Sequence, residues 1–489
     1  MTETRVRKIF AGVGIIAAGQ VALTLLSFIR NLIVAWLLVP EERSVALALG
    51  TYFLTCEACF TVGAERLVIV WPGKEIIRFQ NVGHLVFIAR GILISTVMLA
   101  LSPLVSDFMN MSDYTGAFML VSLAPLVRSF AHLDIFRQQR SMIFSAQVIS
   151  QVMAMAISTI STFVAFLFLK DHRLIILAVF IHQFVFVLAT HFLAEKKYGF
   201  FFNKSYAHEY IIFGLPILGS SLLEAFCQHG DKYIVSYAEG MLYFGDYFLA
   251  MMFVTVPVVV YEMVQGRIGL PWLSQAAEDP ERLREKHRGL LESASFAALT
   301  NIVVMGLVGP TLLVLVFGAK NGACAPIVPL LSAIAATRLL RGAVATIALS
   351  NRNARLCLQL SAIRVIVSLV IIILGIRYGV YAVVVGAIAG ELVAGAHGYL
   401  RLRKAFDWDR PSAGILVSCA MIAVVVIGVF LTLQLFEPWI NWSVVIVAYA
   451  LITTLFLTRS DRLHTYFLRF LEAIPGSPAS RNKIKGSRD

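Results

Sequence analysis

The sequence predicts an all-α polytopic membrane protein with about 14 transmembrane helices, and three observations support this fold class. Of its 489 residues, 59% are hydrophobic and only 14% are charged, which is typical of membrane proteins. The apolar residues form runs of roughly 20, the length that crosses the hydrocarbon layer. Lys and Arg gather in the short segments between these runs, so the net charge of +12 reflects topology, and no nucleic-acid partner is expected.

Fourteen apolar runs have the required length. The first follows the basic residues Arg5–Lys8; it is too long for a signal peptide and lacks a small-residue cleavage site, so we expect a retained helix. The runs lie near residues 9–37, 45–71, 82–105, 115–136, 143–169, 174–194, 210–230, 241–267, 288–315, 325–350, 357–377, 380–400, 412–435 and 440–458.

The distribution of basic residues predicts the orientation, because positively charged loops stay cytoplasmic. The N-terminus, the even-numbered loops and the C-terminal tail hold 28 Lys and Arg, whereas the odd-numbered loops hold 6. Both termini are therefore expected in the cytoplasm. The tail is rich in Ser, Gly, Pro and Lys, which favours disorder near anionic lipid.

A faint internal repeat predicts two lobes. Gly12 precedes Arg30-Asn31 by the same 18 residues that separate Gly214 from Lys232. Two six-helix halves in the same orientation imply a parallel duplication around a central cavity, with two extra C-terminal helices outside it. The predicted parts are an N-terminal lobe at 1–194 (helices 1–6), a cytoplasmic inter-lobe loop at 195–209, a C-terminal lobe at 210–400 (helices 7–12), helices 13 and 14 at 401–458, and a basic cytoplasmic tail at 459–489.

Several motifs, in their order and spacing, resemble the polysaccharide transporter family, the oligosaccharide flippases of the multidrug/oligosaccharidyl-lipid/polysaccharide exporter superfamily. They are R-N-L-I-V-A-W-L-L-V-P-E-E from Arg30, F-R-Q-Q-R at 136–140, F-G-L-P at 213–216, Asp231-Lys232, G-D-Y-F-L-A at 245–250, P-W-L-S followed by E-D-P-E-R-L-R, and L-V-F-G-A-K at 315–320.

The resemblance implies a flippase or exporter that moves polyprenyl pyrophosphate-linked oligosaccharide repeat units across a bacterial inner membrane by alternating access. Exopolysaccharide, capsule or O-antigen synthesis would use the product. Membrane lipids, and a polysaccharide polymerase with chain-length machinery, are the partners it implies. One alternative is a cation-coupled multidrug exporter of the same superfamily, although its cavity should be acidic. Another is a membrane polysaccharide polymerase or ligase, although every predicted outer loop is short.

Seven arginines fall inside the predicted spans, where a charge at the centre of a lipid-facing helix costs at least roughly 3 kcal/mol. We interpret Arg30, Arg128, Arg338 and Arg341 as substrate-binding residues, because guanidinium groups accept phosphate oxygens in pairs and keep their charge. For Arg30, helix–helix pairing is an equal alternative. Arg66, Arg90 and Arg364 lie nearer a span boundary, where snorkelling to the inner surface is an equal alternative.

Acidic residues within or beside the spans are candidates for ion coupling: Glu57, Glu224, Asp231 and Glu391. Pairing with a nearby Arg is favoured over a proton or sodium site. Some members of the resembled family that flip cell-wall precursors bind sodium through acids on spans 7 and 11. Span 11 of this chain offers Gln359 and Arg364 but no acid, which argues against that site.

Other residue patterns favour packing over chemistry. Cys56 and Cys59 are spaced C-x-x-C on an apolar span, and His132, His182, His191 and His229 occur singly among apolar residues. There is no nucleotide-binding glycine loop, and we expect no cofactor, no metal and no enzymatic activity. Asp279-Pro280 predicts a helix start, and Gly386 and Gly390 form a G-x-x-x-G that favours close helix packing.

Overall fold

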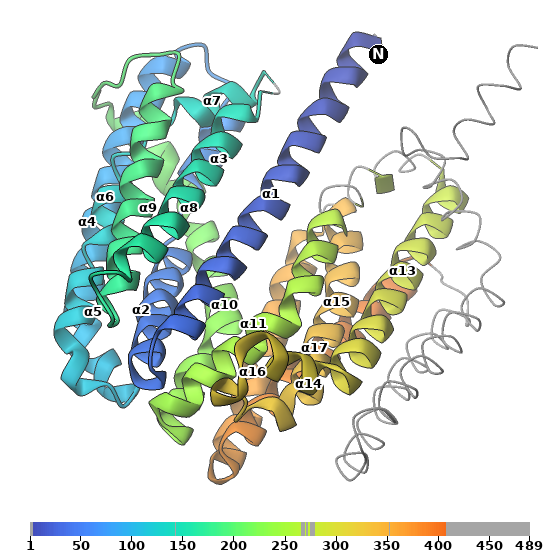
Figure 1. Ribbon diagram of the computed structural model, residues 1–489. Helices are drawn as coiled ribbons and strands as arrows, with labels where there is room; N and C mark the ends of the chain where they lie inside the picture. The colour runs from blue at the N-terminus through green and yellow to red at the C-terminus, as the bar shows by residue number, and fades with distance from the viewer. Residues whose placement is uncertain are drawn as a thin grey trace, which may run out of the picture. The chain divides into compact units, whose positions relative to one another are not determined.

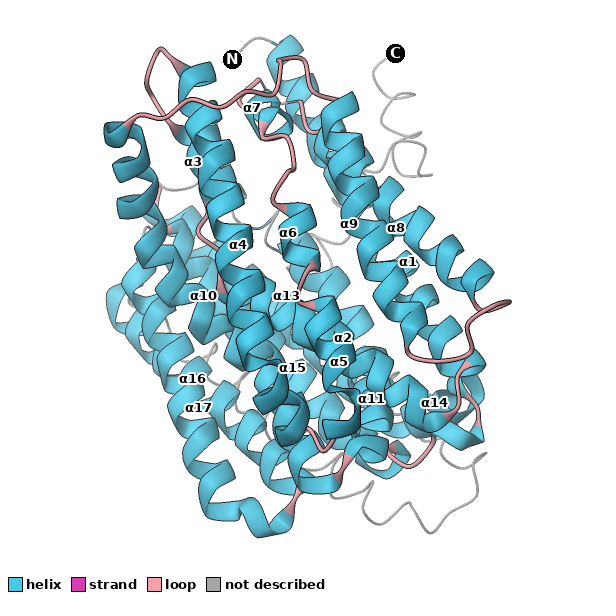
Figure 2. Ribbon diagram, turned by 90° about the vertical axis from the view of Figure 1, so that its left-hand side faces the viewer, coloured by secondary structure: helices cyan, strands magenta, loops and turns pink. Residues whose placement is uncertain are grey.

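The computed structural model describes residues 3–406, apart from residues 142, 266–268, 270, 271, 274–278 and 352. Within this part of the chain the secondary structure is helical with no strand (Figures 1 and 2). Ten of its helices are long and apolar enough to cross a membrane, and a bent pair is an eleventh candidate. The multi-pass prediction is thereby confirmed. The predicted spans at 412–435 and 440–458, and the predicted tail, lie outside the described residues.

The first half of the chain, to the end of the predicted N-terminal lobe, contains nine helices within the described residues. They are α1 (Glu3–Leu37), α2 (Pro40–Cys59), α3 (Ala64–Val70), α4 (Ile76–Phe108), α5 (Thr115–Val121), α6 (Ala124–Arg128), α7 (Asp134–Gln139), α8 (Ser145–Ala165) and α9 (Arg173–Phe192).

The second half continues with long helices of spanning length and one short helix. They are α10 (Lys204–Glu239), α11 (Met241–Val264), α13 (Pro280–Leu307), α14 (Gly309–Phe317), α15 (Val328–Ser350), α16 (Ala354–Gly375) and α17 (Val380–Phe406). The Asp279 side chain caps α13 by accepting from the backbone N–H groups of Glu281 and Arg282 at 3.1 and 3.2 Å, with Pro280 at the first turn. The helix start predicted there is confirmed.

The predicted span at 115–136 is not one helix but the short helices α5, α6 and α7. Pro125 supplies no N–H at the start of α6, and the Ser129 hydroxyl donates to the Leu126 carbonyl at 2.6 Å just after α6 ends. Local bonds of this kind compete with a continuous helix. The break leaves Arg128 at the last position of α6.

The predicted span at 45–71 bends by 43° between α2 and α3. Gly63, with φ of 61°, stands at the break, in a conformation that favours glycine. The F-G-L-P segment of α10 packs there, since a Cβ on Gly63 would lie 2.6 Å from the Ile217 side chain and a Cβ on Gly214 would lie 3.2 Å from the Val62 carbonyl oxygen. The glycines therefore let α10 approach the bend closely.

The described chain divides into two compact units. Unit 1 comprises residues 1–256, 313–326 and 361–393, and unit 2 comprises residues 257–312, 327–360 and the chain from 394 onward. This division differs from the predicted lobes at 1–194 and 210–400, because α11, α14, α16 and α17 are each divided between the units. The two-lobe arrangement stays a prediction, and each unit is described below by itself.

An aromatic core holds α3, α4 and α10 of unit 1 together. The Trp71 and Phe79 rings stack with centroids 4.1 Å apart, and Phe79 stacks in turn on Tyr210 at 4.6 Å. Gly83 is needed beside them, since a Cβ there would lie 2.5 Å from the Tyr210 hydroxyl. Such stacking adds about 0.5–1.5 kcal/mol per pair beyond the burial of area.

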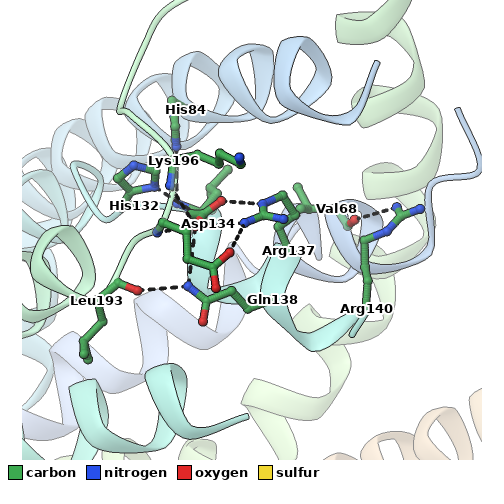
Figure 3. Close-up of polar contacts among 11 residues, drawn as sticks. Val68, His84, His132, Asp134, Arg137, Gln138, Arg140, Leu193 and Lys196 are labelled. Carbon is green, nitrogen blue, oxygen red and sulfur yellow. Dashed lines mark hydrogen bonds and ion pairs between the residues drawn. The ribbon is translucent and has the colours of Figure 1, made fainter. Parts of the chain in front are cut away.

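The F-R-Q-Q-R motif on α7 surrounds the buried carboxylate of Asp134 (Figure 3). Arg137 donates to this carboxylate, which also accepts from the backbone N–H groups of Glu195 and Lys196 at 2.8 and 3.3 Å. Gln138 donates to the Leu193 carbonyl at 2.9 Å. The motif therefore fastens the start of the predicted inter-lobe loop.

Two of the four histidines that occur singly in the sequence, His132 and His191, meet in the fold. The His132 ring lies 5.1 Å from that of His84 and 5.3 Å from that of His191, between centroids, and Tyr198 stacks on His84 at 4.1 Å. His132 and His191 thus pack against other rings, because the chain folds α4, α9 and the segment after α6 together.

The G-x-x-x-G of α17 packs closely against α16, as predicted. A Cβ on Gly386 would lie 3.0 Å from the Ser368 carbonyl oxygen, and a Cβ on Gly390 would lie 2.8 Å from the Arg364 carbonyl oxygen. In unit 2, α13 and α15 pair through small buried residues, and the Asn301 side chain donates to the Ser332 carbonyl at 3.4 Å.

Candidate functional site

The four predicted substrate-binding arginines fall into two sets. Arg30 and Arg128 belong to unit 1, and Arg338 and Arg341 belong to unit 2. Their assignment to substrate binding stays a prediction.

Arg128 is held by neutral groups of α9. Its Nη1 donates to the Gln183 side-chain oxygen at 3.0 Å, and its guanidinium carbon lies 4.4 Å from the centroid of the Phe186 ring. Gln183 and Phe186 are both buried. A cation over an aromatic face is favourable by about 0.5–2 kcal/mol but leaves the charge in place. Arg128 therefore keeps its full positive charge inside the bundle.

Arg30 on α1 is held even more loosely. The nearest acceptor of its Nη1 is the Met155 sulfur at 3.9 Å, and its buried Nε has no partner. The charges of Arg30 and Arg128 both act on His182 of α9. We refer to Arg30, Arg128, His182, Gln183 and Phe186 as the arginine site. It offers two guanidinium groups whose partners are neutral.

Glu57 is paired with Arg90, and the pair borders this site. The Arg90 Nη2 lies 2.9 Å from the Glu57 carboxylate, while its Nε donates to the Phe60 carbonyl at 2.7 Å, at the end of α2. The charges of both residues act on Arg128. Arg90 thus pairs within the protein and does not snorkel, whereas Arg66 on α3 is exposed.

Glu391 and Glu224 both contact Arg364. The Arg364 guanidinium lies 2.7 Å from the Glu391 carboxylate, with both side chains buried, and 3.5 Å from the half-exposed Glu224 carboxylate. These contacts join α16, α17 and α10. Burial of Arg364 in this cluster removes the snorkelling interpretation for that residue.

Asp231 has two partners near the end of α10. Its carboxylate lies 3.3 Å from the Lys232 ammonium group and accepts from the Tyr247 hydroxyl at 2.8 Å. All four acids proposed for ion coupling therefore have a basic side chain within ion-pair distance. Whether any of them couples transport to an ion stays a prediction.

Arg338 of unit 2 makes a two-pronged contact with Glu262 of α11, at 2.8 and 2.9 Å. Glu262 was not singled out from the sequence, although an acid inside an apolar span is itself a functional signal. Arg341 lies on the same helix, α15, and faces α17 at Gly395. A Cβ built on Gly395 would lie 3.9 Å from the Arg341 Cα.

The sequence interpretation also missed a buried ion pair between Arg43 and Asp246. The Arg43 Nη2 lies 2.6 Å from the Asp246 carboxylate, and the side chains are 1% and 9% exposed. Arg43 stands at the edge of a predicted span and was counted as a loop residue. Asp246 lies inside the predicted span at 241–267, which is the signal that could have identified it.

Residues 33–326 match the model of the family described as polysaccharide biosynthesis protein. The chain belongs to this family. The amylovoran biosynthesis protein AmsL of Erwinia amylovora is 22% identical to this chain over 282 residues, which cover 56% of this chain and 71% of AmsL. The resemblance drawn from the sequence motifs is thereby confirmed.

Solved structures share the fold of this chain. The lipid II flippase MurJ in an inward closed conformation aligns with a TM-score of 0.71 at 14% identity, over 91% of this chain and 100% of that one. An inward-facing multidrug resistance transporter of the MATE family, in the MOP superfamily, aligns with a TM-score of 0.61 at 14% identity, over 79% of this chain and 94% of that one. At these identities the likeness concerns the fold alone.

Proposed function

We propose that this chain is a flippase that moves polyprenyl pyrophosphate-linked oligosaccharide repeat units across the bacterial inner membrane, for exopolysaccharide, capsule or O-antigen synthesis. Membership of the polysaccharide biosynthesis family and the fold shared with MurJ support this function. Both termini would face the cytoplasm, and a polymerase with chain-length machinery would use the product. The chain would perform no bond-making chemistry.

The observation that carries the proposal is the charge of the arginine site. In the same unit, Arg43, Arg90 and Arg364 have carboxylate partners at 2.6, 2.9 and 2.7 Å. Arg30 and Arg128, by contrast, contact sulfur, an amide oxygen and an aromatic ring. A charge in a membrane helix without compensation is costly. A pyrophosphate supplies the missing negative charge, and a guanidinium group binds its oxygens in pairs.

Transport by such a protein lowers a solvation barrier. Moving a pyrophosphate and many sugar hydroxyls through hydrocarbon costs tens of kcal/mol, and a barrier of even about 25 kcal/mol would limit crossing to one event in days. A hydrated path open to one side at a time removes this barrier while the lipid tail stays in the bilayer. Outward movement of an anion down an inside-negative potential gains roughly 2.3 kcal/mol per charge per 100 mV.

Arg338 and Arg341 stay candidate contacts for the same cargo. Because the Glu262 carboxylate accepts from two nitrogens of Arg338, we propose that Arg30 and Arg128 make the principal anion contact.

The test is transport by purified protein in vesicles that contain a pyrophosphate-linked oligosaccharide lipid, scored by exposure of the headgroup, with and without a membrane potential. Charge-assisted hydrogen bonds contribute about 1.5–3 kcal/mol, so Arg30→Gln and Arg128→Gln should each lower the rate roughly 10- to 100-fold. The matched control is Arg66→Gln, which removes an equal charge from the exposed side of α3 and should leave the rate unchanged.

Two results would contradict the proposal. One is that the lipid headgroups become exposed equally fast in vesicles with and without the protein. The other is normal transport by the Arg30→Gln/Arg128→Gln double variant, which would show that the cargo is not held through these charges.

A further inference from the structure

A second group of contacts in unit 1 lies away from the arginine site, where α1 and α2 meet. The Lys320 ammonium donates to the carbonyl of Trp36 at 3.0 Å, and the Trp36 indole N–H donates to the Val316 carbonyl at 2.8 Å. Seven residues after Trp36, Arg43 pairs with Asp246 at 2.6 Å. We call these contacts the α1–α2 seam. They join the first half of the chain to α11 and to the end of α14.

Three of the sequence motifs meet in this seam. They are the segment from Arg30 to Glu42, the G-D-Y-F-L-A of α11 and the L-V-F-G-A-K that ends α14. Gly245 permits the approach, because a Cβ there would lie 2.2 Å from the Ser44 hydroxyl and 3.1 Å from the Arg43 Nη2. The motifs thus have a shared structural role.

All the helix ends in the seam belong to one side of the membrane. The seam contains the end of α1, the start of α2, the start of α11 and the end of α14. With the N-terminus in the cytoplasm, as the basic residues predict, these ends are outer. The seam is therefore an outer contact between segments that the repeat assigns to different lobes.

The division of the chain into two compact units also groups outer segments of the second half with the first half. The pieces of α11, α14, α16 and α17 that belong to unit 1 are residues 241–256, 313–317, 361–375 and 380–393. In each helix this is the part nearer the outer end, by the same topology. In these four helices, the segments grouped in the same compact unit as the first half of the chain are therefore the outer ones.

We propose that the α1–α2 seam is the outer closure of the transport path and that release of the cargo requires Arg43 to separate from Asp246. This inference rests on the proposed function. The pair suits a contact that opens and closes, because the desolvation of two buried charges offsets most of their attraction. The buried Nε and Nη1 of Arg43 have no partner, so the closed state does not satisfy this side chain fully.

The geometry offers a covalent test. A Cβ on Gly245 would lie 3.2 Å from the Ser44 Cβ, close to the separation that a disulfide spans. The variant Ser44→Cys/Gly245→Cys, in a background with the native cysteines replaced, should form an intramolecular disulfide under a mild oxidant. Transport of the pyrophosphate-linked oligosaccharide lipid should fall at least tenfold when the disulfide forms and recover when it is reduced.

The reduced form separates this test from the test of function. If reduced protein transports the lipid and the oxidised protein transports it equally well, the seam does not need to open and the inference is overturned. If no disulfide forms, the seam is not closed as described, which also overturns it. If reduced protein and the cysteine-free background carry no lipid, the proposed function itself fails. The single variants Ser44→Cys and Gly245→Cys control for the added side chains.

A second variant reports on the closure without a crosslink. Removing both charges by Arg43→Met/Asp246→Leu avoids leaving one buried charge unpaired. A cysteine at position 44 is then labelled with a membrane-impermeant maleimide added from outside. Its labelling rate should differ at least threefold from the rate in protein that keeps Arg43 and Asp246. The control is Glu75→Gln/Arg78→Gln, which removes an exposed ion pair and should leave the rate unchanged. An equal rate in both variants would contradict a role for this pair in closure.

Discussion

At the scale of single residues, the arginines differ in what compensates their charge. Arg43, Arg90, Arg338 and Arg364 each lie within 2.9 Å of a carboxylate oxygen. Removing one partner of a buried pair leaves an uncompensated charge, which costs about 3–5 kcal/mol. Changes at these arginines therefore lower the amount of folded protein as well as transport. Arg128, with its amide and aromatic partners, is the better position at which to separate the two effects.

Gln183→Glu should abolish the anion site and leave the fold intact. The new carboxylate would stand 3.0 Å from the Arg128 Nη1, where the amide oxygen is now, and would neutralise the guanidinium before a phosphate arrives. We expect transport to fall at least tenfold, with thermal stability equal or higher. Vesicle transport and the melting temperature of the purified protein provide the two measurements.

The isosteric control is Gln147→Glu, because the Gln147 side-chain oxygen accepts from the neutral Gln139 amide at 2.9 Å. This change should leave transport unchanged. Normal transport by Gln183→Glu would show that the charge of Arg128 is not what the cargo recognises.

At the scale of helices, glycines decide where two elements approach. On α17, Gly390 faces the backbone of α16 and leaves room for the buried Arg364–Glu391 pair beside it. The distances from an added Cβ, 2.3 Å to the Ser368 hydroxyl and 2.8 Å to the Arg364 carbonyl oxygen, are too short for any side chain. The two helices would have to separate.

Gly390→Ala should destabilise the protein by about 1–3 kcal/mol, since overpacking forces backbone shifts. Gly116→Ala is the matched control, because nothing lies within 4 Å of a Cβ at that position of α5. There the better helix propensity of Ala should give no loss of stability. Melting of both purified variants checks the prediction; equal melting temperatures would contradict the close approach of α16 and α17.

At the scale of the whole molecule, the orientation decides which face is cytoplasmic. Lys170, between α8 and α9, and Lys197, between α9 and α10, are both exposed lysines in loops on opposite sides of one span. The excess of Lys and Arg in the even-numbered loops predicts that Lys170 is outside and Lys197 is inside.

A membrane-impermeant maleimide added to intact cells should therefore label Lys170→Cys and not Lys197→Cys, and both should react once the membrane is permeabilised. Cells that lack the two substitutions supply the background labelling. The reverse pattern would place the termini outside and would also move the α1–α2 seam to the cytoplasmic face.

Much of the fold could be predicted from the sequence, because hydrophobic length is a local property. The long helices, the cap at Asp279 and the packing glycines Gly386 and Gly390 follow from spacing along the chain. The break-up of residues 115–136 did not follow, because Pro125 and Ser129 interrupt the helix without lowering its hydrophobicity. Motif order was sufficient to indicate the family that the match at residues 33–326 confirmed.

Tertiary structure alone decided which charges are compensated. From the sequence, Arg90, Arg128 and Arg364 were all arginines within apolar spans, yet Arg90 and Arg364 have acids opposite them and Arg128 has Gln183 and Phe186. The partners are 33, 27 and 55 residues away for Glu57, Glu391 and Gln183, so no local pattern connects them. The cost of a buried charge depends on what lies within a few ångströms, and only the folded chain brings those groups into contact.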